Sequence, residues 1–388
     1  MSSWTALDGR RKTFAVAVAV VAVTSVAYAL IIRFAFFGDR AVTAIDDIGE
    51  AVAAALAAGA CTWAASRAVG RDRLGWTLLG ISAGLWAAGE VVWSIDEVFL
   101  GIQPYPSLAD AGFLASVPFA VAGIRSFWGA PRGTSTKWRV WFDGLIVAIA
   151  LTSTAWGFGL RTVWESDSPT KLLDLAYPVS DILVGTILIL AIRRATGDVQ
   201  KGRLAFLLVG IASYSIADSA FAYLQAQGAF GAVGNVIDTG WFTGFLLIAL
   251  AAIYPDSAPR AARQENQLDL WQLALPWMTL LTASAGDFYT ALTGHDLDIV
   301  QSSMTGILAV LLTANMIFER REFLEMLREI ENSRSTLNRD FKTTLVGIQH
   351  LSERINEADR AYDEEVRILA ADIHSSAERL DRLVEEML

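Results

Sequence analysis

The chain of 388 residues is 54% apolar and only 19% charged, with a formal net charge of −10. This apolar content exceeds what the core of a soluble protein needs, and it indicates a chain whose solvent is the lipid bilayer. The acidic balance excludes a general nucleic-acid binder, and the single cysteine, Cys61, excludes an intramolecular disulfide.

Ten apolar blocks long enough to cross a bilayer follow one another up to about residue 318. They lie at about 13–32, 48–65, 74–95, 107–124, 138–160, 172–192, 204–224, 236–254, 268–292 and 299–318. We interpret the first block as a retained membrane helix, since it is about twenty residues long and lacks a small-x-small cleavage site. The expected fold is therefore all-α, a polytopic membrane bundle of about ten spans.

Lys and Arg residues alternate strongly between the two sides of this bundle. Four fall on one side, and the other side holds eighteen: Arg10, Arg11, Lys12, Arg67, Arg71, Arg73, Arg125, Arg132, Lys137, Arg139, Arg193, Arg194, Lys201, Arg203, Arg260, Arg263, Arg320 and Arg321. Because positive flanks resist translocation, the rich side is cytoplasmic. Both termini are then expected in the cytoplasm.

A weak internal repeat links the third and fourth spans to the seventh and eighth. The segment 73–81 matches 203–211 at an offset of 130, and Asp110-Ala-Gly-Phe113 matches Asp238-Thr-Gly-Trp241 at an offset of 128. A true duplication would be a parallel repeat, since both copies keep the same orientation. Apolar helices also resemble one another by composition, so the pattern alone leaves both readings open.

Beyond residue 318 the composition becomes charged while the helical pattern continues. Apolar residues recur at spacings of four and three from Phe323 to Ile355, which is typical of a coiled coil. A polar stretch at 356–363 predicts a turn, and a second apolar stripe follows. We expect three parts: a membrane sensory domain at 1–318, a coiled-coil linker at 319–336 and a helical hairpin at 337–388. Pairing two copies through 323–388 would bury the stripes in a dimeric four-helix bundle.

The hairpin resembles the dimerisation and phosphoacceptor domain of bacterial sensor histidine kinases. The segment Leu337-Asn-Arg-Asp-Phe-Lys-Thr-Thr-Leu-Val-Gly-Ile-Gln-His-Leu-Ser-Glu353 is similar to the H-box helix, and 371–388 resembles the second helix. Arg339 stands where the family has its phosphoacceptor histidine. A guanidinium has no free lone pair for attack on a phosphate, so autophosphorylation is not expected in this chain.

His350 lies eleven residues after Arg339, close to three helical turns, and is the low-ranked substitute for the missing histidine. Most simply, His350 and His374 are solvated bundle histidines, and His295 is a loop residue. The family's ATP-binding domain is absent from the printed sequence. The resemblance implies a bacterial plasma membrane location and output by binding, either to an intact histidine kinase or to a response regulator. Whether the chain is a natural degenerate kinase or a truncated product stays open.

The membrane part resembles the multi-pass sensory modules of bacterial membrane proteins, on segments such as Gly89-Glu-Val-Val-Trp-Ser-Ile-Asp-Glu97 and Tyr177-Pro-Val-Ser-Asp181. Acidic residues recur in the outer halves of its spans, without a neighbouring Lys or Arg. A carboxylate in hydrocarbon costs roughly 3 kcal/mol, so such groups indicate a wet pocket. The candidate ligand-binding residues are Glu90, Trp93, Asp110, Asp181, Asp218 and Asp238, with Asp287 at the outer edge. Aromatic residues beside carboxylates suit an unknown small cation.

A structural alternative competes at three of these positions. Asp110, Asp181 and Asp238 lie near predicted helix starts, where a carboxylate caps free backbone amides. Metal binding is not expected, because no histidine or cysteine accompanies the acids, and no cofactor is expected. The predicted function is a signal-transduction sensor. The alternative is a secondary transporter of a cation or small solute, which the repeat and the buried acids favour.

Overall fold

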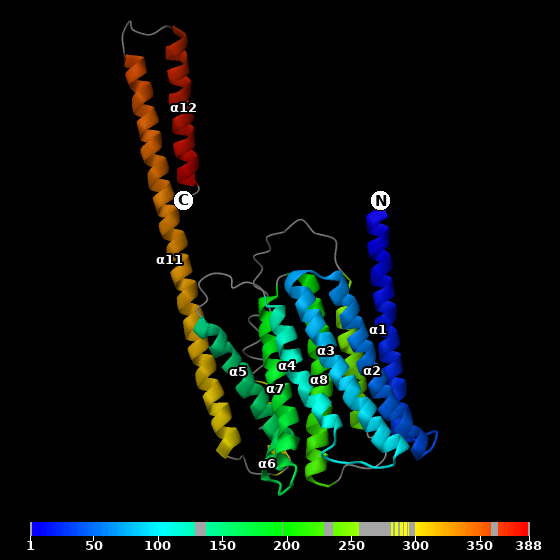
Figure 1. Ribbon diagram of the computed structural model, residues 1–388. Coiled ribbons are helices and arrows are strands. Elements are labelled where there is room, and N and C mark those ends of the chain that lie inside the picture. The colour runs from blue at the N-terminus through cyan, green and yellow to red at the C-terminus, as the bar shows by residue number, and fades with distance from the viewer. Residues whose placement is uncertain are drawn as a thin grey trace. The chain divides into compact units, whose positions relative to one another are not determined.

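The computed structural model describes residues 2–128, 137–195, 197–228, 236–255, 299–357 and 364–386, together with 281, 284, 285, 288, 289, 291, 292 and 294. All regular structure in these residues is helical (Figure 1). The long helices are α1 (Ser2–Phe34), α2 (Asp39–Arg67), α3 (Gly70–Ser94), α4 (Ala109–Ser126), α5 (Lys137–Ala155), α7 (Lys171–Arg194), α8 (Asp198–Ala226), α9 (Thr239–Ala252), α11 (Ile299–Glu357) and α12 (Glu364–Glu386). Short elements are the π-helical η1 (Ile95–Phe99) and η2 (Trp156–Leu160), α6 (Arg161–Glu165) and the 3-10 turn η3 (Val236–Asp238).

Seven helices of the described chain are long and apolar enough to cross a membrane. They are Gly9–Phe34, Asp39–Arg67, Gly70–Phe99, Val140–Glu165, Lys171–Arg194, Asp198–Ala226 and Ile299–Leu351. The expected span at 236–254 corresponds to a shorter apolar helix, Val236–Ala252, and the one at 107–124 corresponds to α4. The expected span at 268–292 lies mostly outside the described residues. The count of ten spans therefore stays a prediction.

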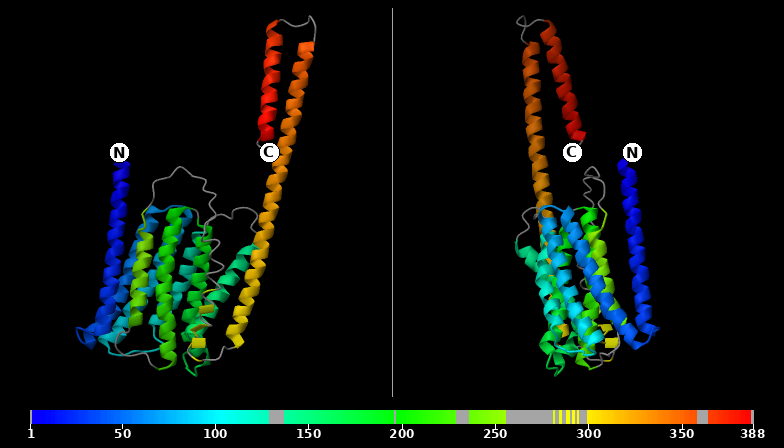
Figure 2. Two further views of the ribbon diagram at one scale, coloured as in Figure 1. Left: turned by 180° about the vertical axis from the view of Figure 1, so that it is seen from behind. Right: turned by 45° about the vertical axis from the view of Figure 1, so that its right-hand side comes forward.

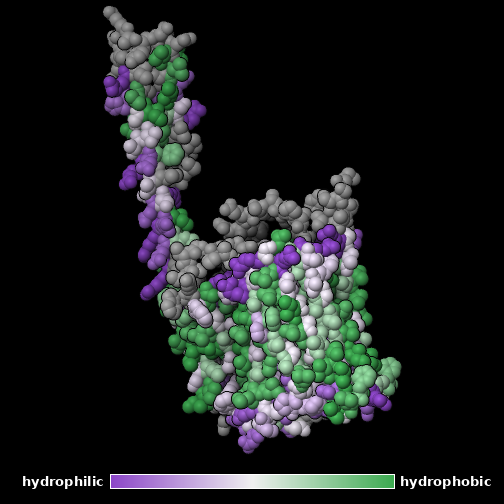
Figure 3. All heavy atoms as spheres, in the orientation of Figure 1, coloured by the Kyte–Doolittle hydropathy of each residue, from purple (hydrophilic) through white to green (hydrophobic). Residues whose placement is uncertain are grey.

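Two compact units divide the chain, Met1–Leu312 and Thr313–Leu388, and the boundary falls inside α11. The first unit carries an apolar surface over the middle of its helices, with hydrophilic residues gathered toward the helix ends (Figure 3). On α1, Val16, Val20 and Val23 are 62%, 58% and 70% exposed. An exposed apolar surface of this kind suits contact with lipid chains.

The first unit contains two sets of three packed helices, in addition to α1, α5, α6 and the N-terminal part of α11. In the first set α2 packs on α3 and α3 on α4, and in the second set α7 packs on α8 and α8 on α9. The sets also exchange contacts, because α2 packs on α9 and α4 packs on α7. The interior between them is apolar, with Ile124, Leu188, Leu204 and Leu207 almost completely buried.

Glycines set the close approach within each set. A Cβ added to Gly112 of α4 would lie 2.8 Å from the Leu85 carbonyl oxygen of α3. A Cβ added to Gly240 of α9 would lie 2.8 Å from the Ser213 carbonyl oxygen of α8. Small residues let helix backbones approach to this distance, which a larger side chain would prevent. The two contacts hold α4 on α3 and α9 on α8 at the end of the unit that carries the acidic residues.

The second unit contains the C-terminal part of α11 and all of α12, which run antiparallel as a hairpin (Figure 2). The helix α11 is unbroken to Glu357, and α12 begins at Glu364, on either side of the predicted turn. Leu345 of α11 and Ala377 of α12 are 5% and 3% exposed. Most of the remaining stripe is exposed in a single chain, so the hairpin alone leaves the predicted seam open to water.

The glycine contacts predict a matched pair of destabilised variants. Gly112→Val would push α4 away from α3, and Gly240→Val would push α9 away from α8. Each should lower the free energy of unfolding by about 1–3 kcal/mol. Gly84→Ala on α3 is the control, since nothing lies within 4 Å of its added Cβ. Removing a helical glycine there should stabilise the protein by up to about 1 kcal/mol. Thermal unfolding of the purified chain measures all three, and equal midpoints would contradict the packing.

Candidate functional site

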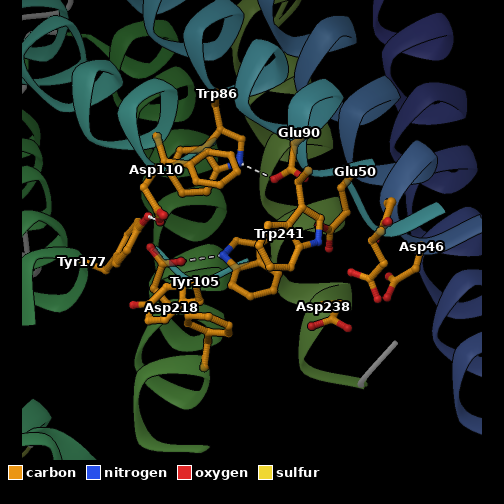
Figure 4. A pocket seen from close by; sticks show the side chains of 15 residues that line it. Asp46, Glu50, Trp86, Glu90, Tyr105, Asp110, Tyr177, Asp218, Asp238 and Trp241 are labelled. Carbon is orange, nitrogen blue, oxygen red and sulfur yellow. Dashed lines mark hydrogen bonds between the residues drawn. The ribbon is translucent and has the colours of Figure 1, made fainter. Parts of the chain in front are cut away.

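A cavity of about 90 Å³ opens at the ends of the helices of both sets (Figure 4). Its lining comprises eight carboxylic acids and seven aromatic side chains: Asp46, Asp47, Glu50, Glu90, Glu97, Asp110, Asp218 and Asp238 with Trp86, Trp93, Tyr105, Phe113, Tyr177, Phe221 and Trp241. Among the lining residues that the structure describes there is no Lys, Arg or His. We call this space the acidic cavity. Its volume suits several waters or a small organic molecule.

On one side of the acidic cavity, two carboxylates are held by aromatic donors. Tyr177 of α7 donates its hydroxyl hydrogen to Asp110 Oδ1, and the backbone N–H of Ser107 donates to Asp110 Oδ2 at 2.6 Å. Trp241 Nε1 of α9 donates to Asp218 Oδ1 of α8 at 2.6 Å. These carboxylates are therefore oriented by neighbours from other helices.

Tyr105, in the segment between η1 and α4, supports the same side from outside the helices. Its hydroxyl donates to Asp174, which is completely buried at the start of α7. Asp174 also accepts hydrogen bonds from Ser168 and Thr170. Burial and the hydrogen bond to Asp174 raise the pKa of Tyr105 above its ordinary value. Tyr105 is therefore a neutral donor at any physiological pH.

On the other side, Tyr28 joins three helices. Its hydroxyl donates to Asp46 Oδ1 of α2 at 2.6 Å, and its ring stacks on Phe242 of α9 with centroids 4.1 Å apart. Asp46 and Asp238 both line this side of the cavity (Figure 4). Trp86 Nε1 donates to Glu90 Oε1 at 2.9 Å.

Some oxygens of the acidic cavity have no hydrogen-bond partner in the described chain. Among them are Asp47 Oδ2 and Glu50 Oε1, both on α2. Their residues are only 6% and 7% exposed. A buried polar group left without a partner costs about 1–3 kcal/mol, and more when it is charged. Such groups indicate a partner that the protein itself does not supply.

A second hollow of about 40 Å³ lies deeper and shares Trp86, Phe113, Tyr177 and Asp218 with the acidic cavity. It is mostly apolar. Asp181 of α7 lines this deeper space, as Asp218 does. The Trp86 and Tyr214 rings meet nearby, with centroids 5.8 Å apart.

Of the six ligand residues predicted from the sequence, the structure brings five to one cavity. Glu90, Trp93, Asp110, Asp218 and Asp238 line the acidic cavity, whereas Asp181 lies in the deeper hollow. The expected Asp287 lies outside the described residues. Whether these residues bind a ligand stays a prediction.

The capping alternative holds for Asp110 in part and fails for the other two. Asp110 accepts the Ser107 N–H beside the first turn of α4. Asp238 is the N-cap residue of α9 but makes no side-chain cap hydrogen bond. Asp181 is the eleventh residue of α7, so it is far from the free amides of the first turn. The carboxylates of Asp181 and Asp238 therefore do not serve as helix caps.

Four further acids of the cavity are not among the residues predicted from the sequence: Asp46, Asp47, Glu50 and Glu97. Asp46 and Asp47 precede the apolar block predicted to begin at 48, whereas α2 begins at Asp39. Glu50 lies inside that block, where the apolar pattern alone does not distinguish it. The spacing of these three acids was available as a signal, since positions i, i+1 and i+4 share one face of a helix. Among the described residues, no group of three or more His, Cys, Asp or Glu side chains is arranged to hold a metal ion.

The hairpin residues discussed above for phosphotransfer do not line the acidic cavity. Arg339 and His350 are both exposed on α11. His374 of α12 lies 3.6 Å from Glu378, one turn further along the same helix. The part of the hairpin that the structure describes thus offers these side chains to solvent.

Comparison with protein-family models, with curated proteins and with solved structures finds no match for this chain.

The link from Tyr28 to Asp46 predicts a measurable loss of stability. Tyr28→Phe keeps the ring on Phe242 and removes only the donor, so it should lower the free energy of unfolding by about 1–2 kcal/mol. Tyr223→Phe is the control, because the Tyr223 hydroxyl makes no hydrogen bond with the described chain. Thermal unfolding compares the two. Equal midpoints for both variants would show that the hydrogen bond contributes nothing.

Proposed function

We propose that the chain is a bacterial membrane sensor that binds a small organic cation in the acidic cavity and reports its presence through the cytoplasmic hairpin. One observation carries the proposal: the described lining is wholly acidic and aromatic, with two buried carboxylate oxygens left unpartnered. An organic cation would satisfy those oxygens and rest against the rings. Both termini would then be cytoplasmic, as the distribution of Lys and Arg predicts.

The ligand class follows from the two kinds of lining. A metal ion would need several oxygens converging on one point, and the described residues offer no such group. An organic ammonium ion can instead contact carboxylates and aromatic ring faces that are spread around the cavity. Each desolvated cation–π contact contributes about 2 kcal/mol or more. The lining therefore favours an amine or a quaternary ammonium ion over a compact metal ion.

A series of helix contacts within the first unit, from α7 through α5 to α11, supports the transmission of ligand binding from the cavity to α11. Tyr177 on α7 lines the cavity, and Arg193 further along α7 forms an ion pair with Asp143 of α5 at 3.1 Å. On α5, Ile146 and Ala150 pack in one apolar cluster with Leu308 and Leu312 of α11. A shift of α7 on binding would thus reach α11 through α5. Helix shifts of about 1–2 Å are a common means of switching.

The exposed stripe of the hairpin supports a dimeric output. Phe323, Leu327 and Ile330 of α11 are 55%, 45% and 56% exposed in a single chain. A second copy would cover them in a four-helix bundle, as the resemblance to histidine kinases implies. With Arg339 at the phosphoacceptor position, the output would be a docking event with an intact histidine kinase or a response regulator.

The binding step can be tested by calorimetry on the full chain in lipid nanodiscs. Tetramethylammonium should bind and sodium should not. Glu50→Gln should weaken tetramethylammonium binding about tenfold, because a buried carboxyl group with an unpartnered oxygen is removed from the cavity. Asp39→Asn is the control, since Asp39 is exposed at the start of the same helix and does not line the cavity. Equal weakening by both variants, or no binding at all, would contradict the assignment.

A secondary transporter is the second candidate, favoured by the two similar sets of three helices. Vesicle flux and cross-linking distinguish the two functions. In a Cys61→Ala background, Leu327→Cys should form inter-chain disulfides at a rate that tetramethylammonium changes at least about twofold, because a sensor must couple occupancy to its output. Glu329→Cys, on the opposite face, should cross-link slowly with or without the ligand.

The matching flux experiment uses the same chain reconstituted in vesicles with labelled tetramethylammonium outside. A sensor should leave uptake at the level of protein-free vesicles. Saturable uptake, with cross-linking indifferent to the ligand, would establish the transporter instead.

A further inference from the structure

We infer that the acidic cavity is a pair of equivalent half-sites made by duplicated helices, and that its ligand is a linear dication with an ammonium group for each half-site. The inference deepens the proposed function and rests on it. It is carried by the register between the two sets of three helices, which relates cavity residues in pairs.

The burial patterns of α3 and α8 fix that register at 128 residues. Seven of the eight buried residues of α8 lie 128 positions after a buried residue of α3. Among these pairs are Trp76 and Leu204, Leu79 and Leu207, Ala83 and Ile211, Trp86 and Tyr214, and Glu90 and Asp218. Burial depends on which face of a helix packs, so agreement along a whole helix indicates equivalent positions.

The glycine contacts give the same register independently. Gly112 approaches the Leu85 carbonyl oxygen, and Gly240 approaches the Ser213 carbonyl oxygen, both at 2.8 Å for an added Cβ. Both members of the second contact lie 128 positions after those of the first. Two helix pairs that meet through matching residues at a matching distance are the expected product of duplication.

The offset of 130 in the sequence match is therefore wrong as a structural register. It pairs Gly80 with Gly210, but these glycines face different helices. A Cβ on Gly80 would meet Thr62 and Cys61 of α2, whereas one on Gly210 would meet the Gly244 carbonyl oxygen of α9. The offset of 128, which relates Asp110 to Asp238, is the one that the packing supports.

This register pairs eight of the fifteen residues that line the acidic cavity. Glu90 pairs with Asp218, Trp93 with Phe221, Asp110 with Asp238 and Phe113 with Trp241. Each pair keeps its chemistry, an acid with an acid and an aromatic with an aromatic. The cavity therefore lies between the two copies, and each copy contributes a similar set of groups.

Each half-site takes one acid from each copy. One half-site is made by Asp110 of α4 and Asp218 of α8, and the other by Glu90 of α3 and Asp238 of η3, the turn before α9. Figure 4 shows Asp110 and Asp218 gathered near Tyr177, and Asp46 and Asp238 gathered on the opposite side, with Trp241 between the two groups. Acids of the two helix sets mix in this way because the sets pack across one another, α2 on α9 and α4 on α7.

Two acidic groups separated by an aromatic ring define the ligand. A compact monocation would occupy one half-site and leave the other without a counter-charge. A linear diamine would place one ammonium in each and lay its methylene chain on the intervening indole. The unpartnered Asp47 and Glu50 oxygens show that the protein leaves acceptors in the cavity for such donors.

Calorimetry of the full chain in nanodiscs tests the inference with putrescine and cadaverine against butylamine and pentylamine, which match them in chain length. The diamine of better-fitting length should bind at least about tenfold more tightly than its monoamine, because the second ammonium engages within the same molecule. Glu90→Gln and Asp218→Asn should each reduce diamine affinity to nearly that of the monoamine. Monoamine affinity should change about twofold or less in either variant, since the other half-site remains.

Asp198→Asn is the matched control, on the same helix as Asp218 but exposed and outside the cavity. It should leave the preference for diamines unchanged. Equal affinity of wild-type protein for diamines and monoamines would overturn the two half-sites while leaving the proposed cation sensor in place. Failure of every amine and of tetramethylammonium to bind would overturn both. The comparison within the wild-type protein does not depend on how well any variant folds.

Discussion

Carboxylates buried at the ends of apolar helices, with no basic side chain in the described lining, impose the constraint on which this structure depends. Each such group costs several kcal/mol to remove from water unless something compensates it. The protein compensates part of the cost with aromatic donors, as Trp86 does for Glu90 and Trp241 for Asp218. Tyr28 does the same for Asp46. The remaining oxygens, on Asp47 and Glu50, define what a ligand must supply.

The duplicated helices explain how one constraint produces a site with two ends. Glycine contacts bring α4 onto α3 and α9 onto α8, so that acids from the two copies meet at one end of the first unit. Crossed packing then places an acid from each copy in each half of the cavity. Parallel repeats are common in transporters, but a repeat shows only how a site was assembled. The series of helix contacts from α7 through α5 to α11 is what favours a sensor.

The sequence predicted the all-helical class, most of the long apolar helices and five residues of the cavity. The helices were predicted from the lengths of the apolar blocks, and the cavity residues from the cost of placing a charge in hydrocarbon. Both signals depend only on the local sequence. It did not find Asp46 and Asp47, because a helix that extends past its apolar block carries no hydropathy signal there, and it did not single out Glu50 within the block. It also placed Asp181 with the other acids, although depth within α7 separates it from the cavity. The register of the repeat was ambiguous for the same reason: apolar sequences match at several offsets, and only packing distinguishes them.

The central claim is that the cavity requires positive charge and not merely a molecule of suitable size. Thermal unfolding of the full chain with choline, and with the neutral alcohol in which carbon replaces the choline nitrogen, tests this directly. The two molecules have nearly the same shape, so they differ in charge alone. The account predicts that choline raises the unfolding midpoint and that its neutral counterpart does not. Equal stabilisation by both, or by neither, would contradict it.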